Sequence, residues 1–274
     1  MEAVGTKMAE WAAHYWTTFW TYADPRSQHL PLVQSPLLVF AIIGSYLYFV
    51  LSLGPRLMRN RPAYNPKRLM LVYNALQVVW CAYIMWKAYE VGWGWRFSWT
   101  CEPLLDSQME PEDFAMAEAV WLYFILKVVD LLDTVFMVVK KNDRQITFLH
   151  VYHHAGMVFA SWFGTKMHPG GGITLMGPIN CFVHVILYGY YFVSLLEPRA
   201  KASWWKKYIT TVQLVQFAIN LVHQLIPFLT PSCPVERKYV VISLVQNAYM
   251  FYLFSDFYYK NYIKTKPKST RKRD

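Results

Sequence analysis

Charged residues are scarce in this chain of 274 residues: they make up 16% of the sequence, whereas apolar residues make up 55%. Soluble domains carry charge on roughly a quarter of their residues, so the composition excludes a disordered chain and an ordinary cytosolic enzyme. Cysteine is also rare, with four residues and no CxxC pair, which excludes a secreted disulfide scaffold and a zinc finger. The net charge of +10 does not indicate nucleic-acid binding, because the basic residues lie between apolar runs.

Long apolar runs are what the sequence has in abundance. Seven runs each approach the roughly 20 residues that a helix needs to cross a bilayer, and segments with Pro or Gly, such as Gly54-Pro55, separate them. They predict an all-α polytopic membrane protein with seven transmembrane helices, in a domain spanning 36–262, between an N-terminal segment (1–35) and a basic tail (263–274). The runs are Pro36–Gly54, Leu69–Trp93, Phe114–Val139, Ile146–Phe163, Ile173–Leu196, Tyr208–Leu229 and Tyr239–Tyr259.

Basic residues are distributed unequally between the two sets of alternate loops. One set, which includes the C-terminal tail, holds 19 Lys and Arg residues, and the other set holds 6. Basic loops stay on the cytosolic side, so we expect a cytosolic C-terminus and an N-terminus across the membrane. The first thirty residues contain Glu2, Glu10 and Asp24 and no uninterrupted apolar region, so we expect no cleavable signal peptide. The aromatic residues between Trp11 and Tyr22 instead predict a segment at the membrane interface.

The cysteines divide between loops and spans. Cys101 and Cys233 fall in two non-cytosolic loops, where disulfides form, whereas Cys81 and Cys181 fall inside spans. We therefore predict a Cys101–Cys233 disulfide, with two free thiols as the alternative.

The third run contains ionisable residues, which are costly in a membrane. Lys127, Asp130 and Asp133, followed by Thr134, each cost roughly 2.5–3.5 kcal/mol at mid-bilayer when charged. A spacing of three residues places them on one helical face. They form either a self-neutralised ion-pair stripe that faces the bundle interior or part of a functional site.

The fourth run contains three histidines on one helical face, His150, His153 and His154. Neighbouring segments add polar residues at helical spacing, and at 1.5 Å per residue these groups share one level in the cytosolic half of the bilayer. They predict a polar chamber that opens to the cytosol and continues into an apolar tunnel, which suits an amphiphile with an acyl tail. The further candidates are Gln145, Asn180, His184, Tyr188, Tyr191, Gln213 and Gln216.

Three classes of function can be weighed for this set of residues. A metal-dependent lipid desaturase or hydroxylase needs more histidine clusters than one HxxHH, although a single metal with three His and a carboxylate remains open. A seven-span receptor or transporter has no need of a charged HxxHH chamber. Nucleophilic catalysis on an acyl thioester uses an imidazole as the nucleophile, oriented by a carboxylate, with amide donors for the developing oxyanion. Cys181 is a weaker candidate for the nucleophile.

Four ordered motifs make the sequence resemble the very-long-chain fatty acid elongases, which are membrane 3-ketoacyl-CoA synthases of the HxxHH type. The resemblance covers nearly the whole chain, with two departures: Asp130 stands where the family has Glu, and Leu187 where it has Met. The motifs are KxxExxDT at Lys127, Asp130, Asp133 and Thr134; QxxFLHxxHH at Gln145, Phe148, Leu149, His150, His153 and His154; NxxxHxxMYxYY at Asn180, His184, Leu187, Tyr188, Tyr190 and Tyr191; and TxxQxxQ at Thr210, Gln213 and Gln216.

The resemblance implies condensation of a long-chain acyl-CoA with malonyl-CoA to give 3-ketoacyl-CoA, CO2 and CoA. It implies an acyl-imidazole on His153, with His150 and His154 supporting it or moving protons. His184 and Asn180 are expected near the thioester. The residues expected to order the site or to bind substrate are Lys127, Asp130, Asp133, Thr134, Gln145, Tyr188, Tyr191, Gln213 and Gln216.

The family fold implies six helices in a barrel around an acyl tunnel closed at the lumenal end, with the first span peripheral. We expect no metal or other cofactor. The expected partners are acyl-CoA, malonyl-CoA, membrane lipid, further elongase subunits, and the reductase and dehydratase of the cycle. The expected location is the endoplasmic reticulum membrane. Arg271 and Lys272 resemble a dibasic retrieval signal, with a generic basic tail as the alternative.

Overall fold

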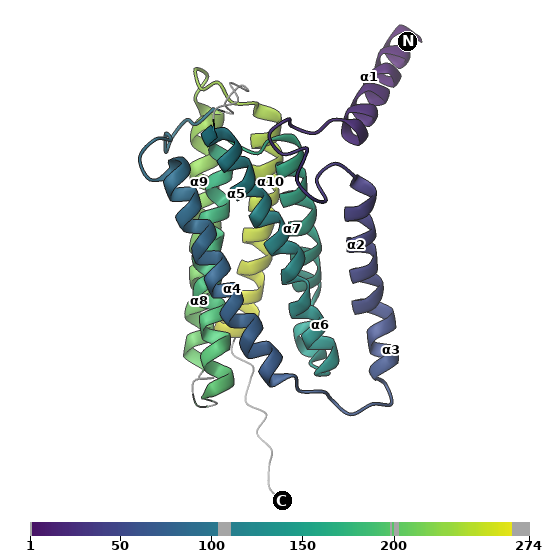
Figure 1. Ribbon diagram of the computed structural model, residues 1–274, viewed down its shortest axis with the longest axis vertical. Helices are drawn as coiled ribbons and strands as arrows, with labels where there is room; N and C mark the ends of the chain where they lie inside the picture. The colour runs from purple at the N-terminus through teal and green to yellow at the C-terminus, as the bar shows by residue number, and fades with distance from the viewer. Residues whose placement is uncertain (1, 104–110, 198, 200–202, 265–274) are drawn as a thin grey trace, which may run out of the picture.

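The computed structural model describes residues 2–103, 111–197, 199 and 203–264, and these residues form helices and no strand (Figure 1). The α-helices are α1 (Glu2–Thr21), α2 (Pro36–Tyr48), α3 (Gly54–Met58), α4 (Lys67–Ala88), α5 (Pro111–Asp130), α6 (Leu132–Val139), α7 (Phe148–Met167), α8 (Met176–Leu196), α9 (Ser203–Leu229) and α10 (Arg237–Tyr258). Three π-helical turns (η1, Phe49–Leu53; η2, Tyr89–Trp93; η6, Tyr259–Ile263) and two 3₁₀ turns (η3, Asp143–Gln145; η4, Gly172–Leu175) extend or join them.

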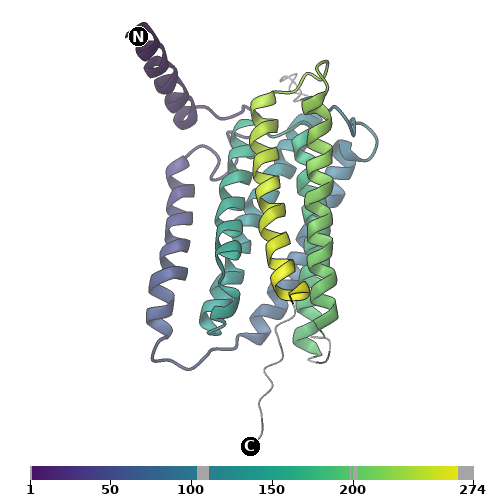
Figure 2. The same cartoon turned by 180° about the vertical axis from the view of Figure 1, so that it is seen from behind.

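The long helices run side by side, and the chain alternates between the upper and lower ends of the bundle in Figure 1. Each helix in the series α4, α8, α9, α10, α7 and α5 contacts the next, and α5 contacts α4. The helix formed by α2, η1 and α3 lies to one side of this circuit, against α7 and α6, as both views show (Figures 1 and 2). α1 extends away from the upper end of the bundle.

Five helical stretches of the described chain are long and apolar enough to cross a membrane: Pro36–Met58, Lys67–Trp93, Gly172–Leu196, Trp205–Leu229 and Arg237–Ile263. Two predicted spans, 114–139 and 146–163, do not reach that threshold, because they contain the ionisable and histidine residues discussed above. They nevertheless form the helices α5–α6 and α7, which lie alongside the apolar helices. An all-α multi-pass membrane protein is therefore the architecture.

Helix boundaries differ from the predicted runs at two informative places. Gly54-Pro55 does not end the first span, because the helix continues through a π turn into α3, where Pro55 occupies a first-turn position that needs no N–H donor. The third span is interrupted at Leu131, where the N–H groups bond in a tighter i−3 pattern, Leu131 N to Val128 O at 3.3 Å. This break lies between Asp130 and Asp133 and sets their relative direction.

The segment between α1 and α2 is fixed to the upper end of α7. The Asp24 N–H donates to the Lys166 carbonyl at 2.8 Å, and the Ser27 hydroxyl donates to the Thr165 carbonyl at 2.6 Å. Asp24 and Arg26 form a buried ion pair at 2.7 Å. The predicted N-terminal segment is thus an ordered connection as well as an aromatic helix. The predicted tail lies almost entirely outside the described residues, as do Arg271 and Lys272.

Candidate functional site

Asp130 is the centre of a buried polar cluster at the junction of α5 and α6. Lys127, one helical turn before it, donates to its Oδ2 at 2.9 Å, and both residues are 2% exposed. Its Oδ1 accepts from the Gln77 amide at 2.5 Å and from the Tyr188 hydroxyl at 3.1 Å. The Tyr188 hydroxyl also contacts Asp133 Oδ2 at 2.7 Å. Helices α4, α5, α6 and α8 thus share one hydrogen-bonded unit.

His184 on α8 joins this unit through Lys127. Its Nδ1 lies 2.9 Å from the backbone carbonyl of Asn180, and since a carbonyl only accepts, Nδ1 holds a proton. In the neutral ring Nε2 then presents a lone pair toward the Lys127 ammonium, 3.5 Å away. The Asn180 side chain accepts from Tyr123 at 2.9 Å and donates to Gln216 at 3.5 Å. The histidine tautomer is therefore fixed by the backbone of its own helix.

His150 is positioned at the first turn of α7. Thr147 caps that helix by accepting from the His150 N–H at 3.2 Å. The His150 ring places Nε2 2.9 Å from the hydroxyl of Thr134, and the same hydroxyl lies 2.9 Å from that of Tyr46 on α2. A hydrogen-bonded chain from Tyr46 through Thr134 to His150 thus connects the peripheral helix to the histidine motif.

The other two histidines extend the row of rings along α7. His150 and His154 have ring centroids 4.2 Å apart, and His153 and His154 are 5.6 Å apart. His153 packs edge-on against Phe254 of α10 at 5.9 Å. Within the described part of the chain, the ring nitrogens of His153 and His154 have no hydrogen-bond partner. Of the three rings, His150 is held by a hydroxyl, whereas His153 and His154 contact only other rings.

Some of the remaining predicted site residues lie in or beside the buried cluster, and one lies outside it. Tyr191 lies next to Tyr188, with ring centroids 6.1 Å apart, and Gln216 is buried beside Asn180. Gln213 is half-buried on the same helix as Gln216. Gln145 is exposed in η3 and accepts a hydrogen bond from Asn142, so it lies at the helix entrance and outside the buried cluster.

Two residues of α4 belong to the cluster but to none of the sequence motifs. Gln77 donates to Asp130, and Tyr73 accepts from Gln77 at 2.9 Å. Both are buried. The available signal was a glutamine four residues after a tyrosine inside an otherwise apolar run, which places both on one helical face.

The cluster is arranged as a hydrogen-bonded network. In the described residues, no three His, Cys, Asp or Glu side chains are grouped so that they could hold a metal ion. The carboxylates face the lysine, the tyrosine and the glutamine, and the histidines of α7 face a threonine and one another. This arrangement suits proton transfer and nucleophilic attack by imidazole.

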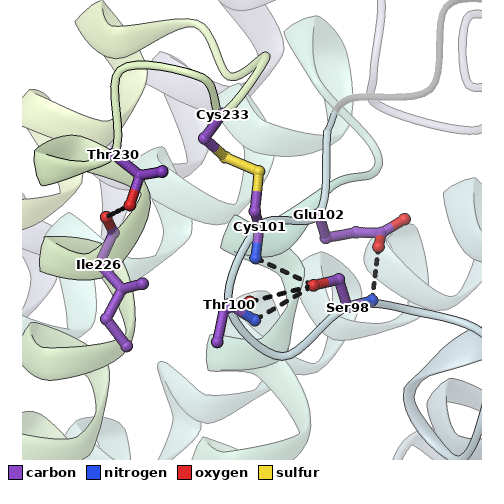
Figure 3. The surroundings of a disulfide bond; sticks show 7 residues. All are labelled: Ser98, Thr100, Cys101, Glu102, Ile226, Thr230 and Cys233. Carbon is purple, nitrogen blue, oxygen red and sulfur yellow. Dashed lines mark hydrogen bonds between the residues drawn. A yellow bond between two sulfur atoms is a disulfide. The ribbon is translucent and has the colours of Figure 1, made fainter.

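At the upper end of the bundle, Cys101 and Cys233 form the predicted disulfide, with Cα atoms 5.7 Å apart (Figure 3). It joins the loop after α4 to the loop between α9 and α10. In the first loop, the Ser98 hydroxyl accepts from the Cys101 N–H at 3.1 Å, and Ser98 N–H donates to Glu102 at 2.6 Å. Cys81 and Cys181 are free and buried. The cross-link ties two loops across the end opposite the histidine motif.

Comparison with known proteins gives a consistent result. The model of the family described as "ELO: GNS1/SUR4 family" matches residues 31–270. Very long chain fatty acid elongase 1 of Mus musculus is 40% identical over 248 residues, which cover 89% of this chain and 88% of that protein. Very long chain fatty acid elongase 7 of Rattus norvegicus is 38% identical over 244 residues (88% and 86%). The Drosophila melanogaster elongase 7 is 37% identical over 246 residues (88% and 74%).

Proposed function

Because the chain belongs to the ELO (GNS1/SUR4) family, we propose that it is a very-long-chain 3-oxoacyl-CoA synthase, the condensing enzyme of fatty acid elongation. It joins a long-chain acyl-CoA to malonyl-CoA and yields 3-ketoacyl-CoA, CO2 and CoA. The observation that carries this proposal is the buried network of Lys127, Asp130 and His184, together with the contact of Thr134 on α6 with the His150 ring of the HxxHH motif.

The first half-reaction transfers the acyl group to His153. A ring nitrogen of His153 attacks the thioester carbonyl, an N–C bond forms, the C–S bond breaks, and the CoA thiolate leaves. The imidazole proton passes to that thiolate, so that CoA departs as the thiol. The choice of His153 rests on the motif that the chain resembles, and His150 is less suited because its ring already bonds to Thr134. The Lys127 ammonium, 3.5 Å from His184 Nε2, suits polarisation of the carbonyl, and Asn180 orients the His184 ring through its backbone carbonyl.

The second half-reaction forms the new carbon–carbon bond. Malonyl-CoA loses CO2, and the electron pair of the broken C–C bond becomes the enolate of acetyl-CoA. The enolate carbon attacks the acyl carbonyl, and His153 leaves and regains a proton. Positively charged groups stabilise the enolate oxygen, and the Lys127 ammonium supplies such a group.

The fold supports a place for the acyl chain. The contact circuit of α4, α8, α9, α10, α7 and α5 is compatible with a barrel around an acyl tunnel that is closed at the lumenal end. The distribution of basic residues supports a cytosolic position for the end bearing the HxxHH motif and for the C-terminus, with the N-terminus across the membrane. We propose the endoplasmic reticulum as the location of that membrane. Neighbours in that membrane are other elongases and the reductase and dehydratase that process the product.

A reconstitution assay tests the proposal. The purified chain, in micelles containing EDTA, receives a saturated acyl-CoA and malonyl-CoA labelled at its free carboxyl group. The label is measured in the released CO2, and the unlabelled 3-ketoacyl-CoA is measured separately. We expect both products from the wild type, loss of both in His153→Ala, and no effect of the chelator. Product formation that requires added iron and oxygen would instead favour the metal-dependent desaturase or hydroxylase, and equal turnover by His153→Ala would reject the nucleophile.

A further inference from the structure

α4 contributes two side chains to the buried cluster, and of these Gln77 contacts Asp130 directly although it lies outside every motif that identifies the chain. Gln77 is 1% exposed, and its Nε2 lies 2.5 Å from Asp130 Oδ1 and 2.9 Å from the Tyr73 hydroxyl. A carboxylate only accepts, so the amide nitrogen faces Asp130, and its two N–H groups are both used. The amide orientation therefore follows from its partners.

Tyr73 attaches the same face of α4 to the break between α5 and α6. Its hydroxyl accepts from Gln77 and lies 3.4 Å from the carbonyl of Val129, the residue before Asp130. Its ring packs edge-on against Tyr188, the tyrosine whose hydroxyl contacts Asp130, with centroids 5.9 Å apart. Tyr73 and Gln77 thus hold both the backbone and the carboxylate at Asp130.

We propose that Gln77 is a positioning residue for the condensation reaction: it fixes the Asp130 carboxylate so that this carboxylate holds Lys127 against His184. The proposal rests on the proposed function, since it concerns the same cluster. The contacts form a continuous series, from Gln77 to Asp130 at 2.5 Å, from Asp130 to Lys127 at 2.9 Å, and from Lys127 to His184 at 3.5 Å. Gln77 itself is separated from the reacting atoms by two side chains.

The length of the side chain at position 130 matters for this contact. An aspartate carboxylate is one methylene, about 1.5 Å, closer to its own helix than the glutamate that the resembled motif contains. The longer glutamine side chain from α4 covers the difference. A glutamate at position 130 facing an asparagine at position 77 would contain the same number of bonds between the two helices, so the pair is exchangeable in principle.

The first test is Gln77→Leu, which keeps the approximate volume and removes both donors. Because the lost hydrogen bonds include one to a charged group, we expect kcat to fall about tenfold to a hundredfold. KM for acyl-CoA should stay within about twofold, as the proposal requires of a residue that acts through Asp130. Asn74→Leu is the matched control. Asn74 is a buried amide on the same helix, and its side-chain nitrogen has no hydrogen-bond partner in the described residues, so we expect its kcat unchanged.

The second test exchanges the side-chain lengths at positions 130 and 77. Asp130→Glu alone pushes a carboxylate into the Gln77 amide, which is already at 2.5 Å, and we expect a loss of kcat of at least about tenfold. Asp130→Glu combined with Gln77→Asn should recover most of that loss. The double variant also tests the role of Gln77 if Gln77→Leu does not fold.

The outcomes separate the two proposals. A wild-type kcat in Gln77→Leu, or an exchange variant no better than Asp130→Glu alone, would overturn the role of Gln77 while leaving the condensing activity intact. A wild-type chain that forms no 3-ketoacyl-CoA would overturn both. A fall of the same size in Asn74→Leu would show a general packing effect on α4 and would also overturn it.

Discussion

Lys127 and Asp130 form a buried ion pair, and we predict that removing one partner destabilises the fold more than removing the other. Removing one partner of a buried ion pair costs about 3–5 kcal/mol, because the other charge is left uncompensated. Lys127→Met leaves Asp130 with two neutral donors, Gln77 and Tyr188. Asp130→Leu leaves the ammonium with a single His184 nitrogen at 3.5 Å and the face of the Tyr123 ring at 4.8 Å.

We therefore expect Lys127→Met to lower the free energy of unfolding by an amount near the lower limit, about 3 kcal/mol. Asp130→Leu should lower it by an amount near the upper limit, about 5 kcal/mol. At about 2–4 °C per kcal/mol for a chain of this size, the two Tm values should differ by about 4–8 °C. The double variant removes both charges and should be more stable than either single variant, although it should be inactive.

The thermal assay can use two native reporters, since Cys81 and Cys181 are free and buried and react with a thiol-specific fluorophore only when the bundle opens. Wild type, both single variants and the double variant are heated in the same detergent. If Asp130→Leu proves the more stable single variant, or if the two destabilisations simply add in the double variant, the reasoning about partner numbers is refuted.

Two further predictions concern the ends of the bundle. Thr134→Val removes the hydroxyl that contacts both His150 and Tyr46 while keeping its shape, so kcat should fall about tenfold with KM unchanged; steady-state kinetics with undiminished kcat would show that this hydroxyl does not orient the ring. Replacing Cys101 and Cys233 by Ser opens a cross-link between residues 132 positions apart and should lower stability by at most about 5 kcal/mol; a reductant should then lower the wild-type Tm and leave the double variant unchanged, and equal sensitivity of both would contradict this.

Much of the architecture follows from the pattern of apolar runs. The helices α4, α8, α9 and α10 correspond to predicted spans with shifts of a few residues. A run of about twenty apolar residues forms a helix in lipid because only a helix satisfies its backbone hydrogen bonds within the segment. Two features of the first and third spans were not predicted: the first continues past Gly54 to Met58, and the third is interrupted at Leu131. Pro55 is tolerated because it begins a new helical segment, and the break at Leu131 depends on packing that hydropathy does not encode.

The site was predictable where its residues repeat at helical spacing. The set on α5–α6, α7 and α8 could be recognised because charged and histidine side chains are costly in a span and therefore conspicuous. Gln77 and Tyr73 were missed because a single amide and a tyrosine are ordinary in a long apolar run, and only the approach of α4 to α8 and α5 reveals what they contact. Gln145 lies outside the buried cluster, at the entrance of α7, and its role in substrate binding stays a prediction.

The connection before α2 shows the same limit. Ser27 and Lys166 are 0% exposed, yet they are polar residues in segments that the sequence assigns to a loop and a helix end. Their burial depends on hydrogen bonds to backbone carbonyls, Ser27 to Thr165 and Lys166 to Gln34. Such contacts join positions more than 100 residues apart and leave no local pattern.

The most direct measurement for the central claim is to trap the intermediate. The purified chain is incubated with a long-chain acyl-CoA in the absence of malonyl-CoA, quenched, digested and analysed by mass spectrometry, with His153→Ala as the control. We predict one equivalent of free CoA and one acyl group on His153, which disappears when malonyl-CoA is added. No release of CoA before malonyl-CoA arrives, or an acyl group on Cys181 or another side chain, would contradict the account.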